Sequence, residues 1–564
     1  MKTRGRIRIL FRNDQGIIAF PGETKYNNKV KCLIRRLGCR EESGTREGSG
    51  REEELSKKKK TKTTPKPKPQ PRPGPEPRGE EKAAETASKA PARGAKQEPP
   101  AGFRLQSPGR MLADFKRQTK EEQLNRGTLL VLILWMLLPV WAFLLYLLSW
   151  IVDGGMGSQD EVGVNFVYQA AFQYAGSFRV LGVVTVFMVL AHVLAFPRSW
   201  YHLKNVMKKE PWFLCLLFLL VWGLIGTIHS EDSFKAFSGS PLQYDGWSSY
   251  VIFAALFLLA FLMTGKEKRM VVYRVCTAVA NPIVLLLLGQ CFEWPGFHDM
   301  LFRAPCSVFF NMNHLGYYLG VSIVLLIGRM LFDRGKKRTV WYFLSYLFQI
   351  YGLMLNNTLG AYLAILIALV ALYIFYFVNG HKFSLVCLLP VVGLAAVSGL
   401  YFTGLLPSSR SSNLLNDAMK TANELQGDET GKISDSAGSA RMRLWREAVA
   451  LIPEHPILGF GPNSMPDYYD KTFVRPHNTV LQLAVFHGIP GVAAYLGALL
   501  TLAFHQFRRL KKLEESVLIA MGGTIFYVLS AFVGVPMFYT SLYFFVLLAF
   551  AAARTRDDPL EGER

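Results

Sequence analysis

The sequence predicts an all-α integral membrane protein of about twelve transmembrane helices, and three observations lead to this prediction. Half of the 564 residues are hydrophobic. From Gly127 onward, apolar stretches of roughly 17–25 residues recur, which is the length that a helix needs to cross a bilayer. Lys and Arg collect in alternate loops between these stretches, as the positive-inside rule requires. This pattern excludes an ordinary soluble enzyme.

The N-terminal residues 1–105 have a different composition from the rest of the chain. They contain the runs Lys57-Lys-Lys-Lys-Thr-Lys62 and Pro65-Lys-Pro-Lys-Pro-Gln-Pro71. Such a segment cannot bury enough apolar surface to offset the entropy lost on ordering, so we expect a disordered tail. A basic juxtamembrane segment, residues 106–127, follows it. Of the 64 Lys and Arg and the 42 Asp and Glu, 32 and 16 lie in residues 1–127, so this part carries +16 of the net charge of +22.

The basic tail allows three interpretations. It could bind nucleic acid or anionic lipid, or it could be a solvated tail on the cytoplasmic side of the membrane. It could also reflect a start assigned too early, since Met111-Leu-Ala-Asp-Phe would be an ordinary N-terminus. We favour the solvated tail, expect no nucleic-acid partner, and expect no signal peptide before the first span.

The predicted spans fall into two groups, nine within residues 128–405 and three within residues 477–553. Their positions are 128–151, 179–197, 211–228, 247–264, 270–291, 312–332, 338–355, 360–378, 383–405, 478–506, 515–535 and 536–553. Basic loops such as Arg198–Lys209 and Arg508–Lys512 all fall on one side of this arrangement. Both termini, including the tail 554–564, are therefore expected in the cytoplasm.

This topology places residues 406–476 outside the cell, as the long loop between spans 9 and 10. A loop of that length without a purpose is uncommon. Its stretch Ala440–Ile452 has helical spacing, with Leu444, Val449 and Ile452 as the expected apolar stripe. Where the loop ends and an apolar run begins stands His477, whose neutral imidazole could accept a proton from a hydroxyl group.

The same loop supplies candidate cations for an anionic substrate. A guanidinium group can bind a diphosphate bidentately, and the candidates are Arg441, Arg443, Arg446 and Arg475. Each also has a purely structural interpretation, because interfacial arginines often snorkel and a histidine at this position could cap a helix. The rival bases are His455, His487, Glu447, Glu454, Asp467 and Asp470.

Other kinds of site have little support. The seven cysteines form no metal-binding motif, so we expect no metal and no cofactor; Cys291 and Cys306 could share a loop and form a disulfide. Arg274 and Arg329 lie near cytoplasmic ends, where they can snorkel, and the spans otherwise carry little charge. Ion-coupled transporters usually keep charged residues at mid-membrane depth, so this scarcity argues against transport.

Three motifs, in order along the chain, resemble one family. They are Phe309-Phe-Asn-Met-Asn-His-Leu-Gly-Tyr-Tyr-Leu319, then Arg441-Met-Arg-Leu-Trp445 with His455-Pro-Ile-Leu-Gly-Phe-Gly461, then His477-Asn478 with Gly488–Leu496. Together with twelve spans and a large loop after the ninth, they resemble the O-antigen ligase/O-antigen polymerase family of bacterial membrane glycosyltransferases.

The resemblance implies a metal-independent, inverting transfer of a glycan from undecaprenyl diphosphate to an acceptor hydroxyl, on the outer face of the cytoplasmic membrane. It implies His477 as the base and Arg441 as the residue that holds the diphosphate. We add as candidate substrate-binding residues Arg443, Arg475, Arg303, Asn313, Asn478 and Tyr468. One position departs from the family, because Leu359 stands where its Ser-Arg-Gly element often has arginine.

The expected partners are the lipid-linked donor, a glycan or lipid-glycan acceptor, the bilayer and polysaccharide-assembly proteins. A polymerase and a ligase differ only in the acceptor, and we favour a polymerase of surface polysaccharide because it needs no specialised acceptor lipid. The alternatives are a lipid-linked glycan flippase and a catalytically inactive structural relative. The single late loop and the lack of an evident internal repeat argue against the flippase.

Overall fold

The computed structural model describes the greater part of the chain after residue 118 and two short stretches before it. The described residues are 10–13, 16–19, 119–152, 159–240, 243–294, 306–309, 311–333, 335–408, 419, 421–423, 437–466 and 475–553. The chain divides into two units, Met1–Ala101 and Gly102–Arg564.

The described part of the first unit is a two-stranded antiparallel hairpin. Strand β1 (Leu10–Asn13) pairs with β2 (Gly16–Ala19), and Leu10 lies opposite Ala19. Ile17, Ile18 and Phe11 favour extended backbone in these eight residues, and the disordered tail stays a prediction. The rest of residues 1–105 lies outside the described residues.

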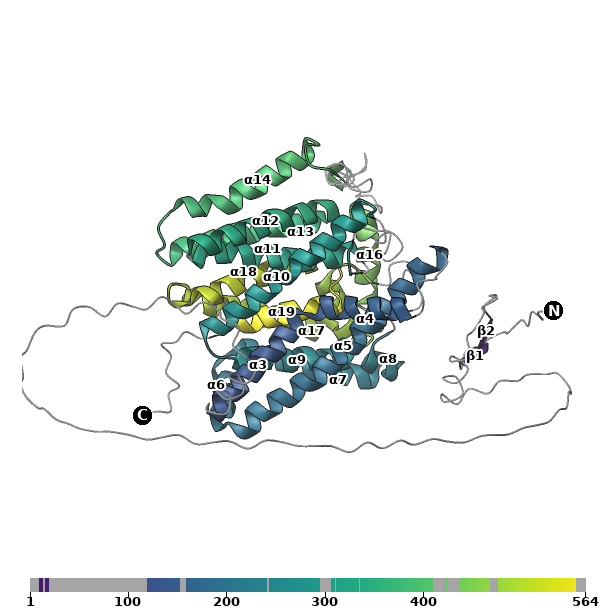
Figure 1. Ribbon diagram of the computed structural model, residues 1–564. Coiled ribbons are helices and arrows are strands. Elements are labelled where there is room, and N and C mark those ends of the chain that lie inside the picture. The colour runs from purple at the N-terminus through teal and green to yellow at the C-terminus, as the bar shows by residue number, and fades with distance from the viewer. Residues whose placement is uncertain are drawn as a thin grey trace, which may run out of the picture. The chain divides into compact units, whose positions relative to one another are not determined.

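The second unit is built from helices. They are α3 (Lys120–Met136), α4 (Leu138–Val152), α5 (Gln159–Ala195), α6 (Pro197–Lys209), α7 (Pro211–His229), α8 (Ser233–Ser238), α9 (Trp247–Leu262), α10 (Lys266–Cys291), α11 (Met312–Phe332), α12 (Lys336–Asn356), α13 (Leu359–Val378), α14 (Leu388–Phe402), α16 (Ala437–Leu451), α17 (Thr479–Arg508), α18 (Glu515–Phe532) and α19 (Phe538–Ala551), with the short turns η1 (Leu385–Cys387) and η2 (Leu510–Lys512). The long helices run alongside one another, with α8 and α16 at one end of the bundle and α6 at the other (Figure 1). We call these ends the α16 end and the α6 end.

Each predicted span falls on a helix, but the count of twelve stays a prediction. By length and apolar composition, eight helices of the described chain can cross a membrane, or nine if α3 and α4, bent by 57° at their junction, form one broken span. Helices α9 and α19 are apolar but shorter. Because these helices are long and apolar, the chain is a membrane protein.

Helix α11 lies at the centre of the bundle. Every residue from His314 to Phe332 is buried, and the helix packs against α10, α12, α13 and α18. Close approach depends on a small residue, since a Cβ atom at Gly320 would lie 1.9 Å from the ring of Phe526. Close packing with the surrounding helices therefore fixes the position of α11. The part of α11 that lies at the α16 end of the bundle is fixed as well.

Two expectations about side chains are corrected here. Arg329 does not snorkel; it is buried in the bundle, where it donates to Thr277 over 2.7 Å and its guanidinium lies 3.8 Å from the ring centroid of Tyr342. Cys291 and Cys306 are free thiols rather than a disulfide. Burial raises the pKa of Cys306 to about 12, so this thiol is unreactive at neutral pH.

Candidate functional site

The loop helix α16 is confirmed, and it packs on α17 through one stripe. Leu444, Ala448 and Leu451 are buried against Val485 and Phe486. The expected stripe was wrong at Val449, which is 53% exposed. Position 449 follows Leu444 by five residues and so lies on another face, whereas spacings of four and seven return to the same face.

Helix α17 is kinked where the chain has Gly488 and Pro490. Gly488 has φ +67°, and the kink leaves carbonyl groups of the preceding turn without helical partners. The loop after α16 supplies these partners: the N–H groups of Phe460 and Gly461 donate to the carbonyls of Val485 and Phe486, over 2.8 and 3.1 Å. The glycine-containing motifs His455–Gly461 and Gly488–Leu496 therefore form the two sides of one junction.

This junction admits no side chain at either glycine. A Cβ atom at Gly459 would lie 2.4 Å from the carbonyl carbon of Phe486, and one at Gly488 would lie 2.2 Å from the carbonyl oxygen of Ile457. The indole N–H of Trp222, on α7, closes the junction by donating to the carbonyl of His487 over 3.1 Å. The loop is thereby fixed to the bundle immediately before the segment that carries His477.

His477 lies two residues before α17, in a left-handed backbone conformation with φ +52°. Its Nδ1 lies 3.0 Å from the carbonyl oxygen of Arg475. A carbonyl only accepts, so Nδ1 carries the hydrogen, and the neutral ring then has its lone pair on Nε2. This is the protonation pattern that a general base needs.

The pKa of His477 lies below its ordinary value of 6.5. Burial is the main cause, and the charges of Arg441 and Arg475 lower the pKa further, while the hydrogen bond to the Arg475 carbonyl opposes them. The imidazole is therefore neutral at pH 7 and can accept a proton.

Arg441 lies near enough to His477 for its charge to act on the imidazole. Arg441 begins the buried side of α16, its charge acts on His477, and the phenol of Tyr317 on α11 acts on Arg441. Burial lowers the pKa of the Arg441 guanidinium, which nonetheless stays charged at any physiological pH. The two residues predicted as base and cation thus share one site, although 35 residues separate them in the sequence.

Arg475 has a different environment from the one expected of a substrate-binding cation. Its side chain is 2% exposed, and Nη2 donates to Asp245 over 2.5 Å, to Asn463 over 2.9 Å and to Gln243 over 3.0 Å. Its Nε and Nη1 have no hydrogen-bond partner among the described residues, and residues 467–474 beside it are not among them. Substrate contact by Arg475 stays a prediction, but the Nη2 edge of its guanidinium is already hydrogen-bonded within the protein.

The remaining predicted residues have separate positions. Asn478 caps α17, since its Oδ1 accepts from the N–H groups of Val480 and Leu481 over 2.9 and 3.1 Å. Asn313 lies in the first turn of α11, half-buried, and Arg443 lies half-buried on α16. Arg303 and Tyr468 lie outside the described residues.

Leu359 provides no replacement for the family arginine. It is the first residue of α13 and packs against the main hydrophobic core. The preceding Thr358 donates to the carbonyl of Met312 over 3.2 Å, so the N-terminus of α13 lies beside that of α11. The position is close to the site, and it carries no charge.

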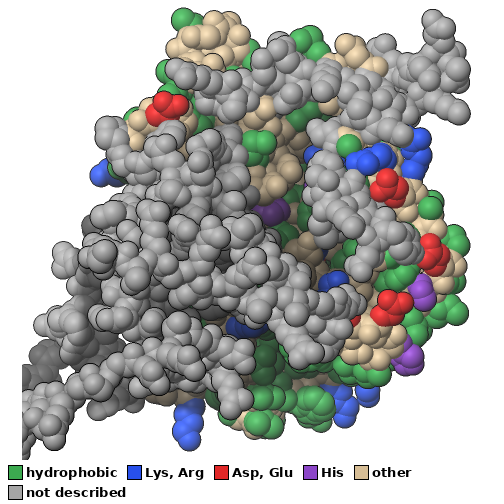
Figure 2. All heavy atoms as spheres, turned by 90° about the vertical axis from the view of Figure 1, so that its right-hand side faces the viewer, with side chains coloured by type: hydrophobic (Ala, Val, Ile, Leu, Met, Phe, Trp, Pro, Cys, Tyr) green, Lys and Arg blue, Asp and Glu red, His purple; other side chains and the backbone are tan. Residues whose placement is uncertain are grey.

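Several helix ends lie together at the α16 end. The N-termini of α11 and α13 are joined at Thr358, and that of α19 is joined to α11 by the contact of Tyr539 with His314. The N-terminus of α17 instead meets the last turn of α18, where Thr479 donates to the carbonyl of Ala531 over 3.0 Å. Helix N-termini carry partial positive charge, so the three N-termini joined at α11 favour an anion. Figure 2 faces this end and shows a histidine set back among hydrophobic side chains, with Lys or Arg side chains nearby.

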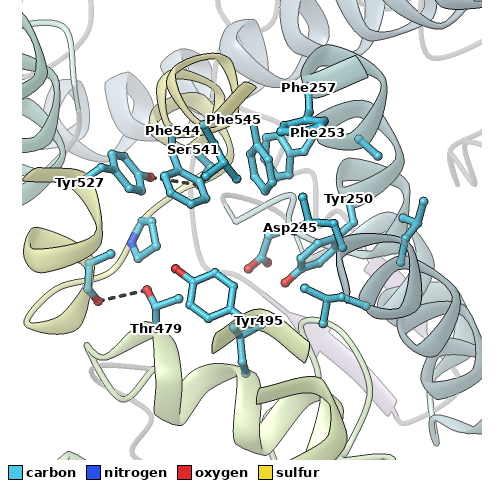
Figure 3. Close-up of a pocket in the computed structure, with 18 of the residues that line it drawn as sticks. Asp245, Tyr250, Phe253, Phe257, Thr479, Tyr495, Tyr527, Ser541, Phe544 and Phe545 are labelled. Carbon is cyan, nitrogen blue, oxygen red and sulfur yellow. Dashed lines mark hydrogen bonds between the residues drawn. The ribbon is translucent and has the colours of Figure 1, made fainter. Parts of the chain in front are cut away.

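An apolar cavity of about 190 Å³ lies between α7, α9, α17, α18 and α19, and Thr479, the first residue of α17, is part of its wall. Near the site its wall includes Thr479, Gln482 and Asp245, and farther along it is lined by Phe213, Phe257 and Leu548. Figure 3 shows the carboxylate of Asp245 and the hydroxyl groups of Tyr250 and Tyr495 directed toward this space. The cavity is polar at its mouth and hydrocarbon-like beyond it.

Sequence reasoning did not identify Asp245, Asn463 and Tyr317 as parts of the site. Asp245 is 230 residues from Arg475, and no local pattern marks it except that it precedes a glycine in a turn. Tyr317 lies inside a quoted motif, Asn313-His-Leu-Gly-Tyr317, and the four-residue spacing that puts it on one face with Asn313 was the available signal. Among the described residues, no three His, Cys, Asp or Glu side chains gather as metal ligands would.

The comparisons with known proteins give one match. Residues 344–496 match the family model described as O-antigen ligase. This range begins in α12 and ends in α17, so it contains α16, Arg441 and His477. No curated protein matches the chain.

Proposed function

We propose, from the membership of this chain in the O-antigen ligase/O-antigen polymerase family, that it transfers a glycan from a polyprenyl-diphosphate donor to an acceptor hydroxyl. The observation that supports the proposal is a neutral His477 with its lone pair on Nε2, close enough to the guanidinium of Arg441 for that charge to lower its pKa. A base and a cation in one site are what displacement of a diphosphate requires.

In the proposed reaction, the acceptor hydroxyl attacks the anomeric carbon of the donor glycan. The new carbon–oxygen bond forms as the bond to the diphosphate breaks, and the hydroxyl proton passes to Nε2 of His477. Arg441 and the N-termini of α11, α13 and α19 neutralise the charge that grows on the leaving diphosphate. A single displacement of this kind inverts the configuration at the anomeric carbon.

The cavity supports a lipid-linked donor. An apolar cavity of about 150 Å³ holds a molecule the size of benzene, so a cavity of about 190 Å³ fits only the first part of a long isoprenoid chain. With that part below Thr479, the attached diphosphate would stand at the level of His477 and Arg441. We place this end of the bundle on the extracytoplasmic face because the basic loops lie at the other end.

The test is the substitution His477→Ala. Loss of a general base lowers the rate by about 10²–10⁴-fold, so cells with this variant should accumulate lipid-linked glycan and lack long surface glycan. The matched control is His229→Ala, an exposed histidine that ends α7. Surface glycan of normal length in His477→Ala, with normal amounts of protein in the membrane, would remove His477 from the reaction.

The acceptor distinguishes a polymerase from a ligase, and we propose the polymerase. Purified protein supplied with the lipid-linked repeat unit alone should make products of several lengths. A flippase would move this lipid without lengthening the glycan. A single product that appears only when a second surface molecule is added would assign the chain as a ligase.

A further inference from the structure

Arg475, two residues before His477, forms a buried ion pair with Asp245. Its guanidinium is held by two other loops, where Asp245 and Gln243 precede α9 and Asn463 follows α16. The backbone carbonyl of the same arginine accepts the hydrogen of His477 Nδ1. One residue thus connects a carboxylate to the ring of the base.

The backbone of His477 needs such support. A non-glycine residue with φ +52° is in a sparsely populated conformation, which persists only when the surrounding structure holds it. On the C-terminal side, Asn478 and Thr479 hold the chain to α17 and α18. On the N-terminal side, only Pro476 stands between His477 and the anchored Arg475, and the fixed φ of proline transmits the position of the arginine.

The pocket around the guanidinium is itself rigid. Asp245 lies between Tyr244, whose carbonyl accepts from Ser249, and Gly246, the N-cap of α9. Gln243 is held by Ser240, which donates to the same Oε1 over 2.9 Å. Asn463 follows the loop that is fixed in the kink of α17. Two loops, one of them more than 200 residues from Arg475 in the sequence, therefore converge on one guanidinium.

We propose that Asp245, acting through Arg475, is a positioning residue that holds His477 in its Nδ1–H tautomer with Nε2 directed at the acceptor. Asp245 balances the charge of Arg475, and the balanced pair fixes the carbonyl that accepts the Nδ1 hydrogen. This inference rests on the proposed role of His477 as the base, and it adds a residue 232 positions upstream to the reaction.

The experiment compares Asp245→Asn with the wild type, in purified protein that consumes lipid-linked glycan. The amide keeps an acceptor but leaves the charge of Arg475 unbalanced, and this charge lowers the pKa of His477. The maximal rate should fall at least about 10-fold, and the acidic limb of the pH–rate profile should move to lower pH. Asp245→Glu, which restores the charge, should recover much of the rate.

A matched control is available at the α6 end of the bundle, where buried Arg269 pairs with Glu514. Glu514→Gln breaks a comparable ion pair far from the site, so it should leave the position of the acidic limb unchanged. If Asp245→Asn does not fold, Gln243→Met is the alternative variant, because it removes one neutral acceptor from the same guanidinium. It should also lower the rate, by about 2–5-fold.

A second measurement is independent of activity. With ring nitrogens of histidine labelled with ¹⁵N, and the His477 signal identified by its loss in His477→Gln, the wild type should show the Nδ1–H tautomer, and Asp245→Asn should show both tautomers. An unchanged tautomer together with an unshifted pH profile in Asp245→Asn would overturn the proposal. An inactive wild type that still shows the Nδ1–H tautomer would instead contradict the proposed function.

Discussion

His477 has its backbone and its ring fixed at the same time, and both restraints come from its immediate neighbours. Asn478 is used entirely as a helix cap, and Arg475 lends its carbonyl to the ring. Neither residue needs to touch a substrate to be important. The run Arg475-Pro-His-Asn-Thr479 is therefore one catalytic candidate, His477, with residues on both sides that hold it in place.

The pH dependence of the reaction should report the state of His477. Its pKa is lowered below 6.5 by burial first, so the ring is neutral and active at pH 7, and activity is lost as pH falls through the lowered value. We expect the acidic limb of the rate to lie below pH 6.5, measured on purified protein across a pH series. An acidic limb above pH 6.5 would assign the base to another group.

The substitution Arg441→Lys should recover only part of the activity that Arg441→Ala loses. An ammonium group preserves the charge near the leaving diphosphate but cannot bind two oxygens in parallel. We expect Arg441→Ala to lower the rate by about 10²–10³-fold and the lysine variant to lie between it and the wild type. Arg446→Ala, an exposed arginine of the same helix, is the control. Equal rates for arginine and lysine at position 441 would argue against bidentate binding.

At the scale of elements, the junction between the α16 loop and the kink of α17 determines where His477 lies relative to the cavity. Carbonyl groups at the kink accept hydrogen bonds from N–H groups of the loop. The apolar stripe of α16 packs on the same turn of α17. Because these contacts share the residues Val485 and Phe486, loop and helix are held as one body. Motion of Arg441 relative to His477 is thereby restricted.

Gly488→Ala should disrupt the junction between the α16 loop and the kink of α17. Alanine at φ +67° and ψ −173°, a region that is essentially confined to glycine, costs about 1–3 kcal/mol in backbone strain, and its Cβ atom would also meet the carbonyl of Ile457. We expect a lower unfolding temperature in detergent and a loss of activity, measured on the same preparation. Gly399→Ala on α14 is the control, because a Cβ atom there meets nothing within 4 Å. Equal stability of the two variants would show that the junction does not need its glycine.

The sequence was sufficient for the elements and for part of the site. Apolar length predicts the helices because a bilayer requires about 20 apolar residues from each. Arg441 and His477 were identified by motif resemblance, and the structure brings them together. The stripe of α16 was misplaced at Val449 because a short amphipathic helix has several candidate faces. Asp245 was not predicted because its partner is 230 residues away, and the pairing depends on how α9 and α17 pack.

For the whole molecule, charge is unevenly distributed along the chain. The excess of positive charge belongs mainly to residues 1–127, whereas the helices that follow are apolar and hold the candidate site at one end of the bundle. Buried polar groups in the bundle are paired across helices, for example Gln349 with Ser322 over 2.6 Å. An apolar medium requires such pairing. The cavity of Figure 3 is therefore unusual in bringing an apolar passage up to a charged site.

Filling this cavity should weaken donor binding without changing the base. Ala254 lines the cavity from α9 and makes no side-chain hydrogen bond, so Ala254→Phe narrows the passage and leaves His477 and Arg441 in place. If the cavity takes the first part of the lipid, KM for the lipid-linked donor should rise several-fold, while the acidic limb of the pH–rate profile stays where it was. Val370→Phe, on the exposed face of α13, is the matched control. A shortened, water-soluble donor lacks the lipid segment, so its KM should be equal in the two variants. If the KM for that donor also rises in Ala254→Phe, the substitution disturbs the site itself rather than the cavity.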